Sequence, residues 1–253
     1  MTNRKILVFG RHGEAPQKVG GGSVDTLVPE TVPVLYEIGC NLRSFVSKNG
    51  IELAKTYLQH SPANRTKYTG EAILVGAFNL QPRSGENPPE SVDDLLNYSF
   101  RNDTYRDTRL SFGKPYINMA IYNANNAVCN GNMDYWLGNP EATEHDGAPI
   151  EAYRSVETRI REATKDALRR LMDDDELLSY DFGVLITHAG LTETVAATLI
   201  GSAQHVEKCD DIGGGLAMAQ GAQLVIDKTP TGLWTAHVER NGQSYKVDLD
   251  KLR

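Results

Sequence analysis

The stretch from Lys5 to Glu14, KILVFGRHGE, constrains the fold more than any other part of this sequence. Its apolar residues Ile6–Phe9 are typical of a short buried strand. The strand runs directly into Arg11 and His12, and a glycine stands on each side of this pair. Because a buried, unpaired charge is costly, we expect an anionic ligand at the carboxyl end of the strand.

Strand and helix patterns alternate along the rest of the chain. Short apolar runs predict strands at residues 55–59, 182–187, 223–226 and 234–238, and the spacing of apolar residues predicts helices over 30–48, 64–78, 151–178 and 191–200. Strands that alternate with helices form a largely parallel sheet with helices on both faces. The sequence therefore predicts an α/β fold, a three-layer α/β/α sandwich with a mostly parallel central sheet.

The stretch 81–149 interrupts this pattern. It is rich in Asn, Asp and Pro, and only short helices are predicted in it, near 92–98 and 117–125. Long excursions of this kind are often functional. No linker demands a second domain, so we expect one domain over residues 1–253 with an inserted cap at about 81–149 that selects the substrate.

Charge and composition argue against several classes of protein. The net charge is −7 and no basic run is present, so no nucleic-acid partner is expected. No apolar run approaches the length that spans a bilayer, and the amino terminus does not resemble a secretory signal. The three cysteines lack the spacing of a disulfide framework or a structural zinc site. We expect a cytoplasmic protein without a membrane partner, metal or cofactor, acting alone or as a homodimer.

Two further strands bring basic residues to one edge of the predicted sheet. The run ITHAG places His188 directly after a strand, and another strand leads into Arg65. Ligands of such sheets bind at the carboxyl ends of the strands, so we expect these residues to meet Arg11 and His12. Two arginines and two imidazoles repel one another unless a dianion joins them, and the planar fork of arginine matches phosphate oxygens. A phosphate site is therefore predicted.

A histidine in such a cluster can act as a nucleophile. A neutral imidazole nitrogen can attack phosphorus in line while the surrounding donors spread the charge of the transition state. The reactive nitrogen is free when the other ring nitrogen donates to a backbone carbonyl. Gly10 and Gly13 allow the backbone to approach closely enough for that arrangement.

Three motifs, in this order, resemble those of the histidine phosphatase superfamily, which has the phosphoglycerate-mutase-like fold. They are RHGE (Arg11–Glu14), SPANRTKYT (Ser61–Thr69), which resembles S-P-x-x-R-[TA]-x-x-T, and ITHAG (Ile186–Gly190). The resemblance covers nearly the whole chain. It implies that His12 is the nucleophile and becomes a phosphohistidine, and that Arg11, Arg65 and His188 bind the phosphoryl group. It further implies a phosphatase that needs no metal and acts on a phosphorylated small molecule or phosphoprotein.

The resemblance fails at the acid that protonates the leaving oxygen. In one branch of the superfamily this acid is the glutamate of a D-P-R-L-x-E stretch, and the similar run DTRLSF here places Phe112 at that position. Another branch takes the acid from the residues after the second histidine, where this chain has Ala189 and Gly190. Four carboxylates of the inserted segment remain as substitutes, namely Glu86, Glu90, Asp94 and Asp107. Without a proton donor, the rate of turnover would fall least for substrates with good leaving groups.

Two alternatives to a phosphatase remain open. A phosphoglycerate-type mutase is the first, although the E-R-H-Y-G-x-L-x-G-like stretch of the mutases is missing. The second is a catalytically weak module that uses the pocket to recognise a phosphorylated partner, and Phe112 at the acid position favours it. A phosphatase that hydrolyses phosphomonoesters is the reading that the three motifs favour.

Overall fold

The computed structural model describes residues 3–16, 24–80, 89–95, 97–98, 102–113, 133–145, 147–173, 179–215 and 219–252. Within these residues, the strands of the main sheet are β1 (Asn3–Arg11), β2 (Thr56–His60), β3 (Asp103–Arg106), β6 (Phe182–Thr187), β7 (Gly221–Lys228), β8 (Trp234–Arg240) and β9 (Gln243–Val247). The longer helices are α1 (Thr31–Lys48), α2 (Asn64–Phe78), α5 (Tyr153–Met172) and α6 (Leu191–Gly201). Shorter elements are α3 (Val92–Leu95), β4 (Glu144–His145) and β5 (Ala148–Pro149).

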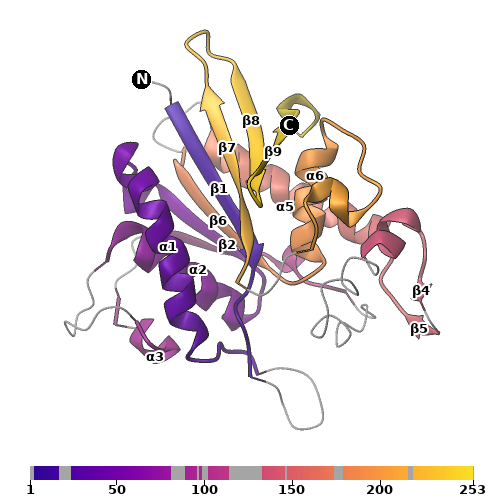
Figure 1. Cartoon of the computed structure of the whole chain (residues 1–253), viewed down its shortest axis with the longest axis horizontal. Helices are drawn as coiled ribbons and strands as arrows, with labels where there is room; N and C mark the ends of the chain where they lie inside the picture. Colours follow the sequence, from indigo (N-terminus) through magenta and orange to yellow (C-terminus); the bar gives the residue numbers. More distant parts are fainter. Residues whose placement is uncertain are drawn as a thin grey trace.

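The main sheet has a parallel core and an antiparallel extension. Its strand order is β3-β2-β6-β1-β7-β8-β9. The first four strands in this order run parallel, whereas β7, β8 and β9 pair antiparallel, beginning against β1. Figure 1 shows helices in front of and behind this sheet, which confirms the predicted α/β/α fold class.

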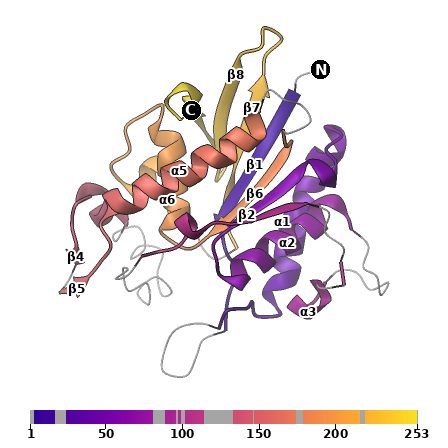
Figure 2. The ribbon, with the colours of Figure 1, turned by 180° about the vertical axis from the view of Figure 1, so that it is seen from behind.

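Each face of the sheet carries its own hydrophobic core. Leu7 and Phe9 of β1 pack with the apolar faces of α5 and α6, while Ile6 and Val8 point to the opposite face, against α1 and α2. Figure 2, seen from behind, shows α5 and α6 on the face opposite to α1 and α2. Alternate residues of a strand point to opposite faces, so a strand buried on both faces is apolar throughout. This explains the unbroken apolar run Ile6–Phe9 in the middle of β1.

The helices α1 and α2 touch backbone to backbone. A Cβ atom added at Gly39 would lie 2.1 Å from the carbonyl oxygen of Ile73, and one added at Gly76 would lie 2.1 Å from that of Tyr36. Arg43 of α1 reinforces the crossing, since its Nε and Nη2 donate to the carbonyl of Gly76 at 3.1 and 3.0 Å. This close packing sets the position of α2, whose first turn carries Arg65.

The structure corrects the predicted end of one helix. The helix predicted over 151–178 ends at Met172, and Asp173 has an extended backbone with φ −59° and ψ 132°. Negative charge opposes the dipole at a helix carboxyl end, which gives a physical reason for the end at the aspartates. The remainder of the predicted helix, residues 174–178, lies outside the described residues.

The described parts of segment 81–149 hold more regular structure than the sequence predicted. The helix predicted near 92–98 is present as α3, and the one predicted near 117–125 lies outside the described residues. The strand β3 was not predicted, yet it forms one edge of the main sheet, parallel to β2. A cap over the site stays a prediction. In the described ranges, no helix is long and apolar enough to cross a membrane.

Candidate active site

Three neighbouring strands end at one edge of the sheet. In the register of the sheet, Arg11 at the end of β1 is level with Thr187 at the end of β6, and His60 at the end of β2 is level with Ile186. The residues that follow these strands therefore meet at one place. The backbone N–H of His12 donates to the carbonyl of Thr187 at 3.0 Å, which ties the first loop to the strand that precedes His188.

The structure brings the two predicted histidines together. The ring centroids of His12 and His188 are 5.1 Å apart, with 72° between the ring planes. His12 is buried, with 9% of its surface exposed, and His188 is partly buried. The two predicted histidines therefore lie side by side, in ring-to-ring contact.

The hydrogen bonds of His12 define which ring nitrogen is reactive. Its Nδ1 lies 2.6 Å from the carbonyl oxygen of Gly13. Because a carbonyl only accepts, Nδ1 carries the proton, and Nε2 of the neutral ring keeps its lone pair. The Nε of Arg65 donates to this Nε2 at 3.4 Å, which agrees with the same tautomer. The lone pair on Nε2 therefore faces a guanidinium group.

The second and third motifs hold this arrangement in place. The Oγ of Ser61, a fully buried residue, lies 2.8 Å from Nε2 of His188. The hydroxyl of Thr69 accepts from the N–H of Gly13 at 3.0 Å and donates to the carbonyl of Arg65 at 2.7 Å. The hydroxyls of Ser61 and Thr69, both in the SPANRTKYT run, thus link the loops that carry His12 and His188. These contacts were not predicted from the sequence.

Arg11 completes the group of four predicted residues. Its side chain is buried, with 9% of its surface exposed, and its backbone N–H donates to the carbonyl of Gln220 at 3.0 Å. The positive charge of Arg11 acts on both imidazoles, because it contributes to lowering the pKa of His12 and of His188. Two guanidinium groups and two imidazoles thus share one site.

Both imidazoles are held neutral. Burial lowers the pKa of His12 to about 4, and the charges of Arg65 and Arg11 add to this effect, although the hydrogen bond to Gly13 opposes it. Burial, together with the His12 ring, Arg65 and Arg11, holds the pKa of His188 well below its usual value. A phosphate dianion would relieve the repulsion among these groups.

The low pKa of His12 makes the stability of the protein depend on pH. Between about pH 6.5 and 4 the unfolded chain binds a proton at His12 that the folded chain excludes, so stability falls as the pH is lowered through this window. Once the pH is below both pKa values, this effect of His12 lowers the free energy of unfolding by an amount on the order of 3 kcal/mol. Above the unfolded pKa the ring is neutral in both states and nothing is lost. Urea unfolding from pH 7 to 4.5 should show a shallower pH dependence for His12→Asn than for the wild type.

The matched control for that measurement is His205→Asn, because His205 is exposed and pairs with Glu207 on the surface. This control should keep the slope of the wild type. Parallel slopes for His12→Asn and the wild type would contradict the neutral, buried state of the His12 ring.

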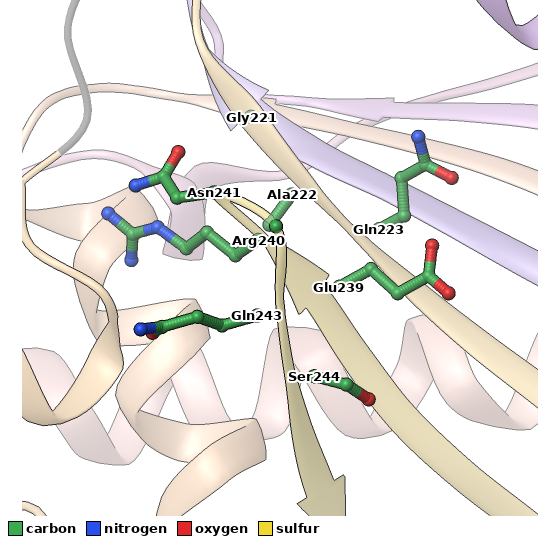
Figure 3. Close-up of a pocket in the computed structure, with 9 residues that line it drawn as sticks. Gly221, Ala222, Gln223, Glu239, Arg240, Asn241, Gln243 and Ser244 are labelled. Carbon is green, nitrogen blue, oxygen red and sulfur yellow. The ribbon is translucent and has the colours of Figure 1, made fainter.

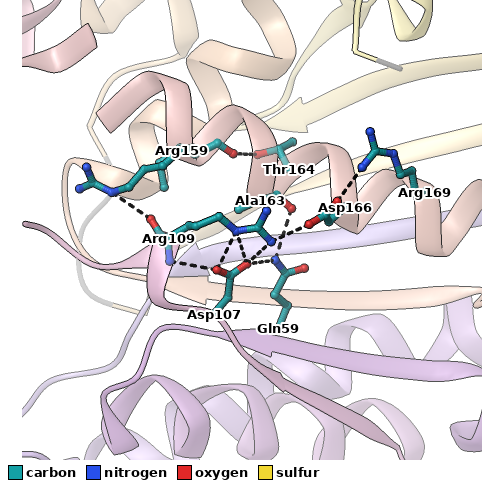
Figure 4. Close-up of polar contacts among 9 residues, drawn as sticks. Gln59, Asp107, Arg109, Arg159, Ala163, Thr164, Asp166 and Arg169 are labelled. Carbon is teal, nitrogen blue, oxygen red and sulfur yellow. Dashed lines mark hydrogen bonds and ion pairs between the residues drawn. The ribbon is translucent and has the colours of Figure 1, made fainter. Parts of the chain in front are cut away.

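Asp107, one of the four predicted substitutes for the acid, is committed to a structural network (Figure 4). It accepts from Arg109 Nη2 at 2.8 Å and from Gln59 Nε2 at 2.7 Å, and Arg109 also pairs with Asp166 of α5 at 2.6 Å. Burial alone would raise the pKa of Asp107, but the hydrogen bonds from Arg109 and Gln59 bring it below the usual value. An ionised, fully engaged carboxylate is a poor proton donor.

The other predicted substitutes receive no support from the described residues. The side chain of Asp94 accepts from the N–H of Glu90 and the hydroxyl of Ser91, at 3.0 and 2.8 Å, and so organises the start of α3. Glu90 is exposed, and Glu86 lies outside the described residues. Phe112 packs against the α5 and α6 core, with its ring centroid 6.2 Å from that of the buried Trp136.

A polar hollow of about 400 Å³ lies elsewhere on the sheet (Figure 3). It is formed by the start of β7 and by the turn between β8 and β9, with Gln223, Glu239 and Gln243 among its lining residues. None of the four predicted site residues lines it. In the part of the chain that is described, no group of three or more His, Cys, Asp or Glu side chains could hold a metal ion.

The chain was compared with protein-family models, curated protein sequences and solved structures, and only solved structures are similar to it. No protein-family model matches the chain, and no curated protein sequence matches it. Among solved structures, the chain is similar to Mycobacterial hydrolase 2, with a TM-score of 0.54 and 18% identity over 100% of this chain and 96% of that one. It is also similar to a phosphoglycerate mutase from Bacillus anthracis, with a TM-score of 0.50 and 15% identity over 99% and 96%.

A third similar structure is the product of the open reading frame Rv3214 from Mycobacterium tuberculosis, with a TM-score of 0.50 and 14% identity over 95% of this chain and 98% of that one. At such low sequence identities, the similarity to these three structures establishes the fold of the chain and nothing further. The chain has the phosphoglycerate-mutase-like fold, which confirms the fold that the resemblance of the three motifs implies.

Proposed function

We propose that the protein is a phosphatase that hydrolyses phosphomonoesters, without a metal ion, through a phosphohistidine on His12. The observation that carries this proposal is the pair of hydrogen bonds on the His12 ring. Nδ1 is committed to the Gly13 carbonyl, and the lone pair of Nε2 faces the guanidinium of Arg65. A phosphoryl group bound to Arg65 would lie directly in front of a nucleophilic nitrogen.

The proposed reaction has two displacements. First, Nε2 of His12 attacks phosphorus, the P–O bond to the leaving group breaks, and the leaving oxygen takes up a proton. Water then attacks the phosphohistidine, and the P–N bond breaks to give phosphate and the neutral ring. Arg11, Arg65 and His188 carry the charge of the transferring phosphoryl group in both steps. The Gly13 carbonyl stabilises the positive charge that the ring gains in the first.

Turnover of p-nitrophenyl phosphate in the presence of EDTA tests this function. We expect steady release of phosphate from the wild type and a loss of about 10²- to 10³-fold in kcat/KM for Arg65→Met, because one preorganised donor to the phosphoryl group is removed. Arg161→Met is the matched control, since Arg161 is half exposed on α5 and pairs with Glu157. It should keep the activity of the wild type.

The same assay separates the alternatives. The binding module is favoured by one observation, the packing of Phe112 into the core at the position of the expected acid. It predicts phosphate binding by calorimetry with no release of nitrophenol above the buffer rate. A mutase predicts interconversion of 2- and 3-phosphoglycerate with little net phosphate release. Either result would contradict the proposed phosphatase.

A further inference from the structure

A carboxylate that the motif comparison did not single out lies next to the phosphate-binding arginine. Oδ1 of Asp25 is 3.8 Å from Nη1 of Arg65 and 3.4 Å from its backbone nitrogen. The Nε of the same guanidinium donates to the reactive nitrogen of His12. One planar guanidinium group therefore separates the carboxylate from the predicted nucleophile. The negative charge of Asp25 acts to raise the pKa of His12, although less strongly than burial lowers it.

The loop that carries Asp25 is fixed to the site on both sides. The N–H of Val24 donates to the carbonyl of Pro16 at 2.8 Å, and the N–H of Val28 donates to that of Glu14 at 2.9 Å. Between them, Leu27 is buried, with 3% of its surface exposed, and packs next to Gly13. The backbone on each side of Asp25 is thus tied to the residues that follow His12.

Asp25 is more exposed to solvent than Arg65. The side chain of Asp25 is 51% exposed, compared with 19% for that of Arg65. The leaving group of an in-line displacement departs on the side of phosphorus away from His12. A solvent-accessible carboxyl group next to Arg65 can exchange protons with both the departing oxygen and the water that attacks afterwards.

The stretch of sequence that follows Phe112 offers no substitute for the missing acid. Phe112 occupies the position of the expected acid, and from there to Met133 the chain contains no Asp or Glu. Asp107 is engaged by Arg109 and Gln59. Asp25 is also paired with an arginine, but its ion pair is longer, 3.8 Å to Arg65, and this arginine is predicted to bind the phosphoryl group.

We infer that Asp25 is the proton donor and acceptor of the proposed phosphatase, supplied by the loop between β1 and α1 in place of the missing glutamate. This inference rests on the proposed function. As the P–O bond breaks, the protonated carboxyl of Asp25 gives its proton to the leaving oxygen. The carboxylate then takes a proton from the water that attacks the phosphohistidine, which restores the acid.

The dependence of the rate on the leaving group tests this role. Nitrophenolate leaves without a proton, whereas the alkoxide of glycerol phosphate needs one. For Asp25→Asn we expect kcat/KM to fall by about 10²- to 10⁴-fold with glycerol phosphate and by less than about tenfold with p-nitrophenyl phosphate. Phosphate affinity should stay within a few-fold of the wild type. Glu30→Gln, at an exposed carboxylate five residues further on, is the control and should leave both rates unchanged.

The outcomes distinguish this inference from the function on which it rests. Equal losses with both substrates would overturn it, because they would mean that Asp25 only orients Arg65. Unchanged rates with both substrates, or a wild type that hydrolyses only p-nitrophenyl phosphate, would also overturn it. If the wild type hydrolyses neither substrate, the phosphatase itself is wrong and the inference falls with it.

Discussion

Replacing His12 with alanine is expected to reduce the turnover of phosphomonoesters by at least about 10⁴-fold, because the change removes the atom that forms the bond to phosphorus in the proposed reaction. The remaining donors, Arg11, Arg65 and His188, would still bind phosphate. The loss should therefore appear in kcat, while the affinity for inorganic phosphate changes far less. Steady-state kinetics with p-nitrophenyl phosphate, combined with calorimetry of phosphate binding, measures both quantities.

Two further variants show whether the loss of activity could come from a loss of folding. His12→Asn keeps a polar side chain in the buried position, and it should be as inactive as His12→Ala while unfolding near the temperature of the wild type. His205→Ala removes an exposed histidine that pairs with Glu207 and should remain fully active. A His12 variant that is folded and retains more than about a tenth of the wild-type kcat would contradict a nucleophilic role.

Substituting alanine for Gly39 is expected to lower the free energy of unfolding by about 3 kcal/mol, the upper part of the range for overpacking. The added Cβ would lie 2.1 Å from the carbonyl oxygen of Ile73 and 2.8 Å from the backbone nitrogen of Ala77. Both are backbone atoms, so α1 and α2 must move apart. The intrinsic preference of helices for alanine over glycine, about 1 kcal/mol, acts in the opposite direction and is too small to compensate.

Urea unfolding of three glycine variants measures this effect. Gly76→Ala should lose a similar amount, since its Cβ would meet the carbonyl of Tyr36 at 2.1 Å. Gly201→Ala is the control, because the nearest atom to its Cβ, in the side chain of Val206, lies at an ordinary 3.8 Å. It should be neutral or slightly stabilising. If Gly39→Ala were as stable as Gly201→Ala, the close approach of the two helices would be wrong.

The sequence predicted the parts of the fold in which local pattern and burial agree. The strand 182–187 and the helix 64–78 have the predicted bounds, because β6 is buried throughout and α2 is buried continuously from Thr69 to Ala77. In contrast, β3 (DTYR) and β9 (QSYKV) lie at the two edges of the sheet and were not predicted. Edge strands are polar and partly exposed, so they lack the apolar signal of a central strand.

The site residues that were predicted from the sequence are those that directly follow strands with a clear apolar pattern. Arg11 and His12 follow β1, and His188 follows β6, so the order of the strands brings them together. The contact between Ser61 and His188 spans 127 residues, and the one between Asp25 and Arg65 spans 40. Such contacts depend on the paths of loops, which hydrophobic periodicity does not encode. For this reason the sequence did not predict that Asp25 lies beside Arg65.

Trapping the phosphoenzyme tests the central claim most directly. The wild type is mixed with substrate, quenched within milliseconds under alkaline conditions that preserve phosphohistidine, digested, and examined by mass spectrometry. The account predicts a phosphoryl group on the peptide that contains His12, formed before phosphate is released and absent from His12→Asn. Phosphate release with no phosphoenzyme, or a phosphoryl group on another residue, would contradict it.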